Sequence, residues 1–242
     1  MKHYTYCYQC NEEDRGDSIA IGEINSNLIA ICECKNGHRF ISGLMHELFD
    51  ILYLSALDSF FNGSYSESVM SFTASLERTY EFFIKVTMLK EEITLESIDS
   101  FWKELKNQSE RQIGAFCSQY LKVSKTSWHL NTDMVSFRNN VIHKGYIATS
   151  DEVKKYANYT TSLQMTILNI LKSEFSEECT KLYFHQKEVN SSSTKELQKK
   201  TKLQFVATGH PSILKWDIPG SQDLTIDEAI EDYKRIYEKF KK

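Results

Sequence analysis

Apolar residues recur at helical spacing through most of the chain, from residue 42 to about residue 189. The clearest run covers residues 65–90, and its apolar positions are Val69, Phe72, Leu76, Tyr80, Phe83 and Val86. Spacings of three and four predict an amphipathic helix with one side in a core. Similar patterns predict helices over residues 44–61, 95–106, 110–122 and 132–144, and a long one from residue 150 to Phe175.

Serines mark several of the expected helix starts. The segment FFNGSYSES ends the first helix and caps the second, and Ser150-Asp151 is expected to cap the last. The apolar face of the first helix is expected at Leu44, Leu48, Ile51, Leu52 and Ser55. Short connections between such helices favour an antiparallel bundle over residues 42–190.

The two ends of the chain have a different pattern. Residues 1–41 hold two β-like runs, IAIGEI (19–24) and NLIAICEC (27–34). We expect residues 190–196, NSSSTKE, to be a polar linker. After it, LQFVAT and SILKWDI predict strands, and residues 224–242 predict a capped, charged helix. The expected fold class is mainly α: a small β module (1–41), a helical bundle (42–190) and a strand–helix appendage (191–242).

Composition narrows the classes of function. Of 242 residues, 41% are hydrophobic and 26% charged, as in ordinary soluble globular proteins, and the net charge of −4 gives no overall attraction to nucleic acid. The amino terminus has no apolar run that could act as a signal peptide, and acidic residues interrupt the most hydrophobic segment, 44–61. We therefore expect a cytoplasmic protein that does not associate with membranes.

Four of the six cysteines fall in the first 34 residues, in the spacing Cys7-x2-Cys10 and then CECKNGH. Thiolates and imidazole are the ligands that tetrahedral zinc prefers, and Asn36-Gly37 can turn the chain back after the second pair. The expected ligands are Cys7, Cys10, Cys34 and His38, with Cys32 as the alternate. No HExxH-like helix accompanies them, so a structural Zn²⁺ is favoured over a catalytic one. The alternative is a cluster of buried, reduced cysteines.

The second candidate site is SFRNNVIHKGY, residues 136–146, near the end of a predicted helix. On an ideal helix, Asn139 and His143 lie about 40° apart, whereas Arg138 and His143 lie about 140° apart. Arg138 must therefore reach round the helix or meet a histidine of a second copy. Structural roles are also available, because His143 can stabilise the helix end and Arg138 can pair with Asp133 or Glu77.

The string FRNNVIHKG resembles the R-x4–6-H signature of the HEPN superfamily, which has a polar residue after the arginine. SLERTYEFF on the second bundle helix is also similar to HEPN proteins, where an acidic residue can face the motif, and this makes Glu77 a member of the site. The resemblance covers about residues 42–190. It implies a metal-independent endoribonuclease for single-stranded RNA that dimerises so that two motifs form one cleft.

In that interpretation His143 moves the proton, Arg138 binds the scissile phosphate and Asn139 holds the histidine or the sugar. The resemblance also implies a defence or toxin-type effector with a partner or regulator protein. A non-catalytic HEPN-like dimerisation or RNA- or nucleotide-binding module is the alternative, and an unrelated helical adaptor is a third hypothesis.

RNA contacts have several candidates outside the motif. Lys122, Lys125 and Lys144 are expected near it, and KELQKKTK (195–202) follows the bundle. Tyr4, Tyr6 and Tyr8 alternate on an expected strand, where they can stack on RNA bases or pack on the bundle.

Overall fold

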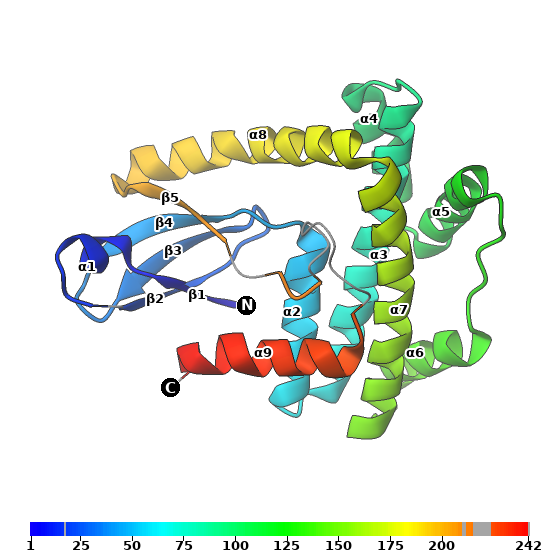
Figure 1. Ribbon diagram of the computed structural model, residues 1–242, viewed down its shortest axis with the longest axis horizontal. Coiled ribbons are helices and arrows are strands. Elements are labelled where there is room, and N and C mark those ends of the chain that lie inside the picture. The colour runs from blue at the N-terminus through cyan, green and yellow to red at the C-terminus, as the bar shows by residue number, and fades with distance from the viewer. Residues whose placement is uncertain (17, 210–211, 215–223, 242) are drawn as a thin grey trace. The chain divides into compact units, whose positions relative to one another are not determined.

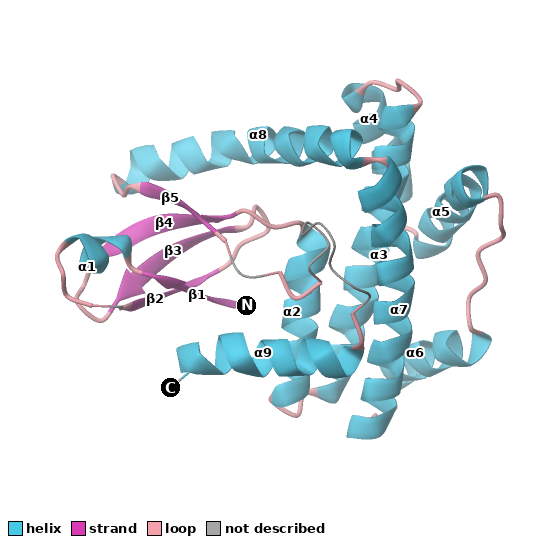
Figure 2. Cartoon of the chain, viewed as in Figure 1, coloured by secondary structure: helices cyan, strands magenta, loops and turns pink. Residues whose placement is uncertain are grey.

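The structure of the protein is a computed structural model that describes residues 1–16, 18–209, 212–214 and 224–241, the last six by their backbone alone. It is 65% helix, with a small curled β-sheet at the amino terminus (Figures 1 and 2). The chain forms two compact units. The first comprises 1–47, 183–212 and 234–242, and the second 48–182 and 213–233. Among the described helices, none has both the length and the apolar character that a membrane span needs.

The second unit is a bundle built around one central helix. Its helices are α2 (Leu48–Phe61), α3 (Tyr65–Lys90), α4 (Leu95–Leu105), α5 (Ser109–Ser124), α6 (Thr132–Lys144) and α7 (Ser150–Glu174). Helix α3 contacts each of the other five. All six apolar positions predicted for it are buried, and the observed bounds of α3 and α6 are those that the sequence predicts.

The interface between α3 and α7 contains a row of buried polar contacts. The Gln164 amide donates to Ser75 Oγ at 2.8 Å and to Thr79 Oγ1 at 2.9 Å. Thr73 Oγ1 likewise lies 2.8 Å from the Tyr156 hydroxyl. Because each buried polar group costs free energy unless it is paired, these bonds favour one register of α7 on α3. They place Gln164, in the middle of α7, beside the middle of α3, and Tyr156 beside Thr73.

Two predictions about helix α2 were wrong. It begins at Leu48, because residues up to Leu44 belong to a strand. Its buried side is formed by Phe49, Tyr53 and Leu57 with their neighbours, which include Ile51 of the predicted face, whereas Leu48 is 41% exposed. The cap of α7 is also one residue earlier than predicted: Thr149 and Glu152 form a reciprocal capping box.

The first unit contains one five-stranded sheet in the order β1-β2-β3-β4-β5 (Figure 1). Its strands are β1 (Lys2–Tyr6), β2 (Ile19–Glu23), β3 (Ile29–Cys34), β4 (Arg39–Leu44) and β5 (Phe205–Thr208). Neighbours are antiparallel except for β4 and β5, which are parallel. Buried His3 on β1 lies 2.8 Å from Ser42 Oγ on β4, so the sheet curls enough to bring these strands together.

The carboxy-terminal part of the chain differs from its predicted pattern. Residues 190–196 are not a linker but lie within α8 (Ser176–Thr201), a helix whose serines and threonines bond to carbonyls one turn earlier. The strand predicted at LQFVAT is observed as β5. Ile213 and Leu214 of the second predicted strand are not in a strand, and the rest of SILKWDI lies outside the described residues. The charged helix is α9 (Ile226–Lys241), capped by Thr225 and Glu228.

Candidate functional site

Helix α6 carries the RNNVIH motif, and local signals define both of its ends. Asn131 caps the start by accepting bonds from the backbone N–H groups of Asp133 and Met134. Gly145 ends it with φ of 68°, a left-handed conformation that suits glycine. The Tyr146 backbone N–H then donates to the Asn140 carbonyl at 3.1 Å. His143 therefore lies in the last turn of α6, where its side chain is exposed.

Arg138 is the centre of the site. Its Nη1 donates to Asn139 Oδ1 at 2.9 Å and lies 3.4 Å from His143 Nε2. Its Nη2 lies 3.5 Å from Glu77 Oε1 on α3. The structure therefore brings all four predicted side chains together. Arg138 does reach round the helix to His143, which was one of the two predicted arrangements.

The contact between Arg138 and His143 has a consequence for the imidazole. A guanidinium has only N–H donors, so His143 Nε2 can accept from it only when that nitrogen carries no proton. An unprotonated ring nitrogen beside a cation is a group that can accept a proton from a substrate.

Glu77 and Tyr156 surround the other side of Arg138. The Arg138 and Glu77 side chains are 23% and 24% exposed, so their ion pair is partly shielded from water. Burial raises the pKa of Tyr156 to about 12, although its bond to Thr73 and the charge of Arg138 act in the opposite direction. The apolar pattern of this helix gives no signal that links Tyr156 to the motif.

The lysines predicted near the motif have different surroundings. Lys122 pairs with Glu91, and the Lys125 ammonium donates to the Lys122 carbonyl at 2.6 Å. Lys144 is exposed beside His143. These two contacts engage Lys122 and Lys125 within the protein, so Lys144 is the best placed of the three to meet a substrate.

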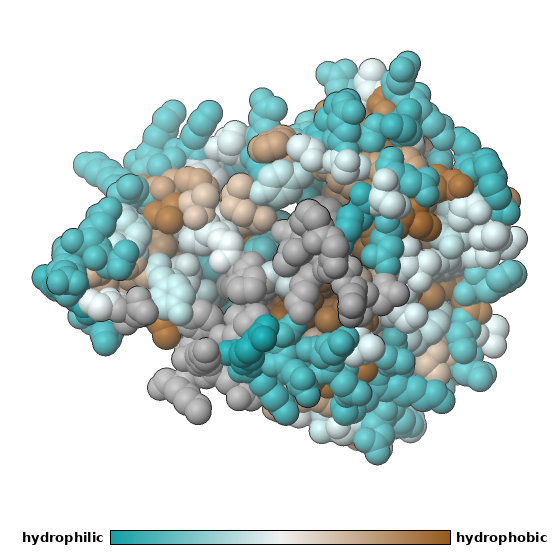
Figure 3. Space-filling model, viewed as in Figure 1, coloured by the Kyte–Doolittle hydropathy of each residue, from teal (hydrophilic) through white to brown (hydrophobic). Residues whose placement is uncertain are grey.

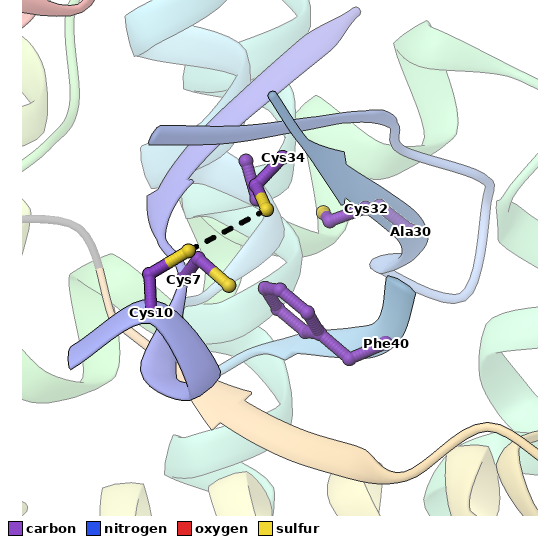
Figure 4. Close-up of a cluster of buried hydrophobic side chains, with 7 residues drawn as sticks. Cys7, Cys10, Ala30, Cys32, Cys34 and Phe40 are labelled. Atoms are coloured by element: carbon purple, nitrogen blue, oxygen red, sulfur yellow. Dashed lines mark hydrogen bonds between the residues drawn. The ribbon is translucent and has the colours of Figure 1, made fainter. Parts of the chain in front are cut away.

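The metal-ligand cluster lies in the first unit. Cys7, Cys10, Cys34 and His38 form a group whose ligand atoms all lie within 4.8 Å of one another, and these residues could hold a metal ion such as Zn²⁺. Three sulfur atoms converge (Figure 4). Cys7 lies between β1 and the one-turn helix α1 (Tyr8–Glu12), Cys10 lies on α1, and Cys34 ends β3.

The distances in the cluster match a tetrahedral ion. Bonds of about 2.3 Å from zinc to sulfur and about 2.0 Å to nitrogen require S–S edges of roughly 3.8 Å and S–N edges of roughly 3.5 Å. The Cys10 and Cys34 sulfurs are 3.7 Å apart, and His38 Nδ1 lies 3.2 Å from Cys10 Sγ and 3.6 Å from Cys7 Sγ. These three edges are thus close to those of a tetrahedral zinc site, and the donor set is one that zinc prefers.

The second turn of the cluster forms as Asn36-Gly37 predicts. Gly37 has φ of 81°, and its N–H donates to the Cys34 carbonyl at 2.9 Å. Burial by itself would raise the pKa of Cys34, but N–H groups of Asn36 and His38 and the neighbouring thiols lower it. The thiolate that a metal needs is thus favoured at Cys34.

Two residues of the cluster's surroundings were not predicted. Glu13 Oε2 lies 3.4 Å from His38 Nε2, and the Asn36 amide donates to Cys10 Sγ at 3.2 Å. Such outer contacts orient a ligating histidine through its second nitrogen. The spacing of residues could not predict these contacts. Glu13 lies between two other acidic residues, and the sequence does not indicate which of the three faces His38.

Cys32, the alternate ligand, is not part of the group. It is fully buried on β3 beside Gly22 of β2, in the same buried cluster as the three converging sulfurs (Figure 4). Burial raises its pKa to about 11, partly offset by a bond with Ser42. Cys32 is therefore a protonated core thiol.

Comparisons with models of protein families, with curated proteins and with solved structures found no match for this chain. The resemblance to HEPN proteins therefore stays a prediction from the sequence motif and the helical pattern around it.

Proposed function

We propose that the chain is a metal-independent endoribonuclease of the HEPN type that cleaves single-stranded RNA at Arg138 and His143. One observation carries the proposal: the Arg138 guanidinium touches His143, Asn139 and Glu77 at an exposed helix end. If Arg138 had only a structural role, its ion pair with Glu77 would be sufficient. The added contact with a histidine supplies the two groups that phosphodiester cleavage needs, a proton acceptor and a cation.

The proposed reaction uses the ribose 2′-hydroxyl of the RNA as nucleophile. Its proton passes to His143 Nε2 while the 2′-oxygen forms a bond to phosphorus and the bond from phosphorus to the 5′-oxygen breaks. Arg138 stabilises the charge that develops on the phosphate oxygens. The leaving 5′-oxygen takes up a proton, so the products are a 2′,3′-cyclic phosphate and a 5′-hydroxyl.

A homodimer completes this proposal. One copy supplies one histidine, and a second copy with its own His143 would supply the acid for the leaving group. Glu77 is assigned a positioning role, because its carboxylate is engaged with the guanidinium. The proposed biological setting is a defence or toxin-type effector controlled by a regulator protein.

The direct test incubates purified protein with mixed single-stranded RNAs in EDTA, beside His143→Ala and Arg138→Ala. The proposal expects cleavage by the wild type that both substitutions abolish. Equal cleavage by all three proteins would place the activity elsewhere. No cleavage by any of them would favour the second candidate function, a non-catalytic module. The ion pair between Arg138 on α6 and Glu77 on α3 also supports that candidate, because an ion pair can hold two helices together without any role in catalysis.

We further propose that the ion at Cys7, Cys10, Cys34 and His38 is a structural Zn²⁺. Four protein ligands leave no open position for a substrate, as in structural zinc sites. The three cysteines are nearly fully buried, and they join β1, α1 and β3. A metal there would hold together a sheet too small to form a large core.

A further inference from the structure

The outer face of the amino-terminal sheet carries aromatic and aliphatic side chains. His3 points toward Ser42 on the inner face, so its neighbours along β1, which include Tyr4 and Tyr6, point to the other side. The register pairs Tyr4 with Ile21 and Tyr6 with Ile19 on β2. Tyr6 is 56% exposed and Ile21 is 45% exposed. This sheet therefore presents large apolar surfaces to solvent.

A groove continues this face toward α8. It has a volume of about 580 Å³. Its apolar lining comes from the isoleucines of β2 and β3 and from Leu197 of α8, and Lys2, Glu23, Glu33 and Arg39 contribute its charges. The groove thus combines apolar side chains with charges of both signs.

The helix beside the groove shifts the local balance toward positive charge. Residues 195–202 contain four lysines and one glutamate. Lys200 lies one turn from Leu197, on the groove side, and Lys195 and Lys199 share the outer side of the helix. Hydrophilic side chains line this outer edge of α8 in Figure 3. The groove and this segment together hold six cationic side chains and three carboxylates, in a chain whose net charge is −4.

These lysines differ from other cations of the same unit in their surroundings. Arg15 pairs with Glu13, Arg39 with Glu33, and Lys187 donates to two backbone carbonyls. Lys195, Lys199, Lys200 and Lys202 are all exposed, and within the described part of the chain none has an ionic partner. Lysines near the carboxyl end of a helix do interact well with its dipole, but Lys195 is nearly two turns from the end, beyond that effect.

We propose that this surface, formed by Tyr6, Ile21, the groove and the lysines of α8, binds single-stranded RNA. Bases would stack on Tyr6 and enter the apolar groove, and the lysines would contact the phosphates. The inference rests on the proposed ribonuclease function, for which it supplies a substrate-holding surface on the unit that lacks Arg138 and His143. A duplex hides its bases, so the surface should discriminate against double-stranded RNA.

The test measures binding of a fluorescent single-stranded RNA to the full chain carrying His143→Ala, which prevents cutting during the measurement. Tyr6→Ala should weaken binding about fivefold to a hundredfold, the usual contribution of one stacked base. Phe184→Ala is the matched control, since it removes another aromatic ring of the same unit that is 63% exposed. That control should bind like the parent.

Salt dependence tests the lysines separately. The double variant Lys195→Gln, Lys199→Gln should reduce the slope of log affinity against log salt by about 1.4, as expected for two lost contacts with single-strand phosphates. Lys103→Gln, Lys106→Gln, two exposed lysines of the other unit, should leave the slope unchanged. Polyglutamate of equal charge should compete poorly, because it offers no bases.

The inference is overturned if RNA does not bind, or if Tyr6→Ala and the α8 double variant bind like their controls. It is also overturned if polyglutamate competes as well as RNA, because that result would indicate a site for acidic proteins. Cleavage by the wild type is measured independently. RNA binding that depends on Tyr6, in a protein that does not cleave, would retain this surface and reject the nuclease. Cleavage by a protein whose RNA binding does not depend on Tyr6 would retain the nuclease and reject this surface.

Discussion

The Arg138 guanidinium lies 3.4 Å from His143 Nε2, although five residues separate them on one helix. Side chains at this spacing point about 140° apart on an ideal helix, so the contact depends on the reach of arginine and on the position of His143 in the last turn. The same guanidinium group contacts Asn139 and Glu77. Arg138 thereby connects a proton acceptor on α6 with a carboxylate on α3.

Removing the Glu77 carboxylate should disturb the position of Arg138 while the guanidinium itself remains. Glu77→Gln keeps the size of the side chain but loses the ion pair, and we expect RNA cleavage to fall roughly tenfold, equivalent to about 1.4 kcal/mol of lost positioning. The measurement is the initial rate of cleavage at saturating RNA. Glu67→Gln, an exposed position on the same helix, is the control and should cleave at the wild-type rate. Equal rates for both variants would show that Glu77 does not position Arg138.

Metal content should distinguish Cys34 from Cys32. We expect one zinc per chain in the wild type, retained in Cys32→Ala and lost in Cys34→Ala, because only Cys34 lies with the other ligands. Elemental analysis of the purified proteins measures this. Chelation of the metal should lower the unfolding temperature of the wild type and of Cys32→Ala. Loss of zinc from Cys32→Ala with retention in Cys34→Ala would reverse the assignment.

His3 should make stability depend on pH. Burial, followed by the charge of His46, lowers its pKa in the folded protein from 6.5 to about 4. The unfolded chain therefore binds a proton before the folded one does. Stability from this residue is present above pH 6.5 and is lost as the pH falls toward 4, by up to about 3 kcal/mol.

Urea unfolding at pH 7 and pH 4.5 measures the effect. His3→Gln retains a side chain that can bond to Ser42 and does not titrate, so its loss of stability between these pH values should be smaller. The same loss in both proteins would assign the acid sensitivity to other groups.

Replacing glycine with alanine should have opposite effects on stability at Gly145, which ends α6, and at Gly114, which lies within α5. Gly145 has φ of 68°, and Gly145→Ala should destabilise the protein by about 1 kcal/mol. Gly114 lies within α5 with open space around it, so Gly114→Ala should stabilise it by about 0.5–1 kcal/mol. Thermal unfolding measures both. Stabilisation by Gly145→Ala would contradict the left-handed helix end that positions His143.

Local sequence patterns predicted most helices of the bundle, because their apolar periods are regular and α4, α6 and α7 carry side-chain caps. The serine cap predicted for α3 is not formed, since Ser64 makes no side-chain bond to the first turn. The bounds of α3 and α6 and the burial of Val69, Phe72 and their partners followed from spacing. Spacing also selected Cys34 and His38, because Asn36-Gly37 dictates the turn between them. Helix α2 was harder to predict, since it is apolar on most sides and its period does not identify the buried face.

Contacts between distant segments could not be predicted from one sequence. The parallel pairing of β5 with β4 joins residues more than 160 positions apart, and no local signal selects that partner. Serine and threonine in residues 190–196 resembled a linker, yet their hydroxyls bond to carbonyls of the preceding turn and remain compatible with a helix. The contact of Glu77 with Arg138 was one of two pairings considered, and only the packing of α6 on α3 selects it.

The ends of the RNA products test the central claim most directly. In EDTA, the wild type should produce fragments that end in a 2′,3′-cyclic phosphate and begin with a 5′-hydroxyl, identified by mass spectrometry, and an RNA with 2′-deoxyribose at the cleavage site should remain intact. Lys103→Ala, at an exposed position on α4, should give the same products, and His143→Ala none. Products from His143→Ala, or cutting of the deoxyribose-containing RNA, would contradict the assignment of Arg138 and His143 as a ribonuclease site.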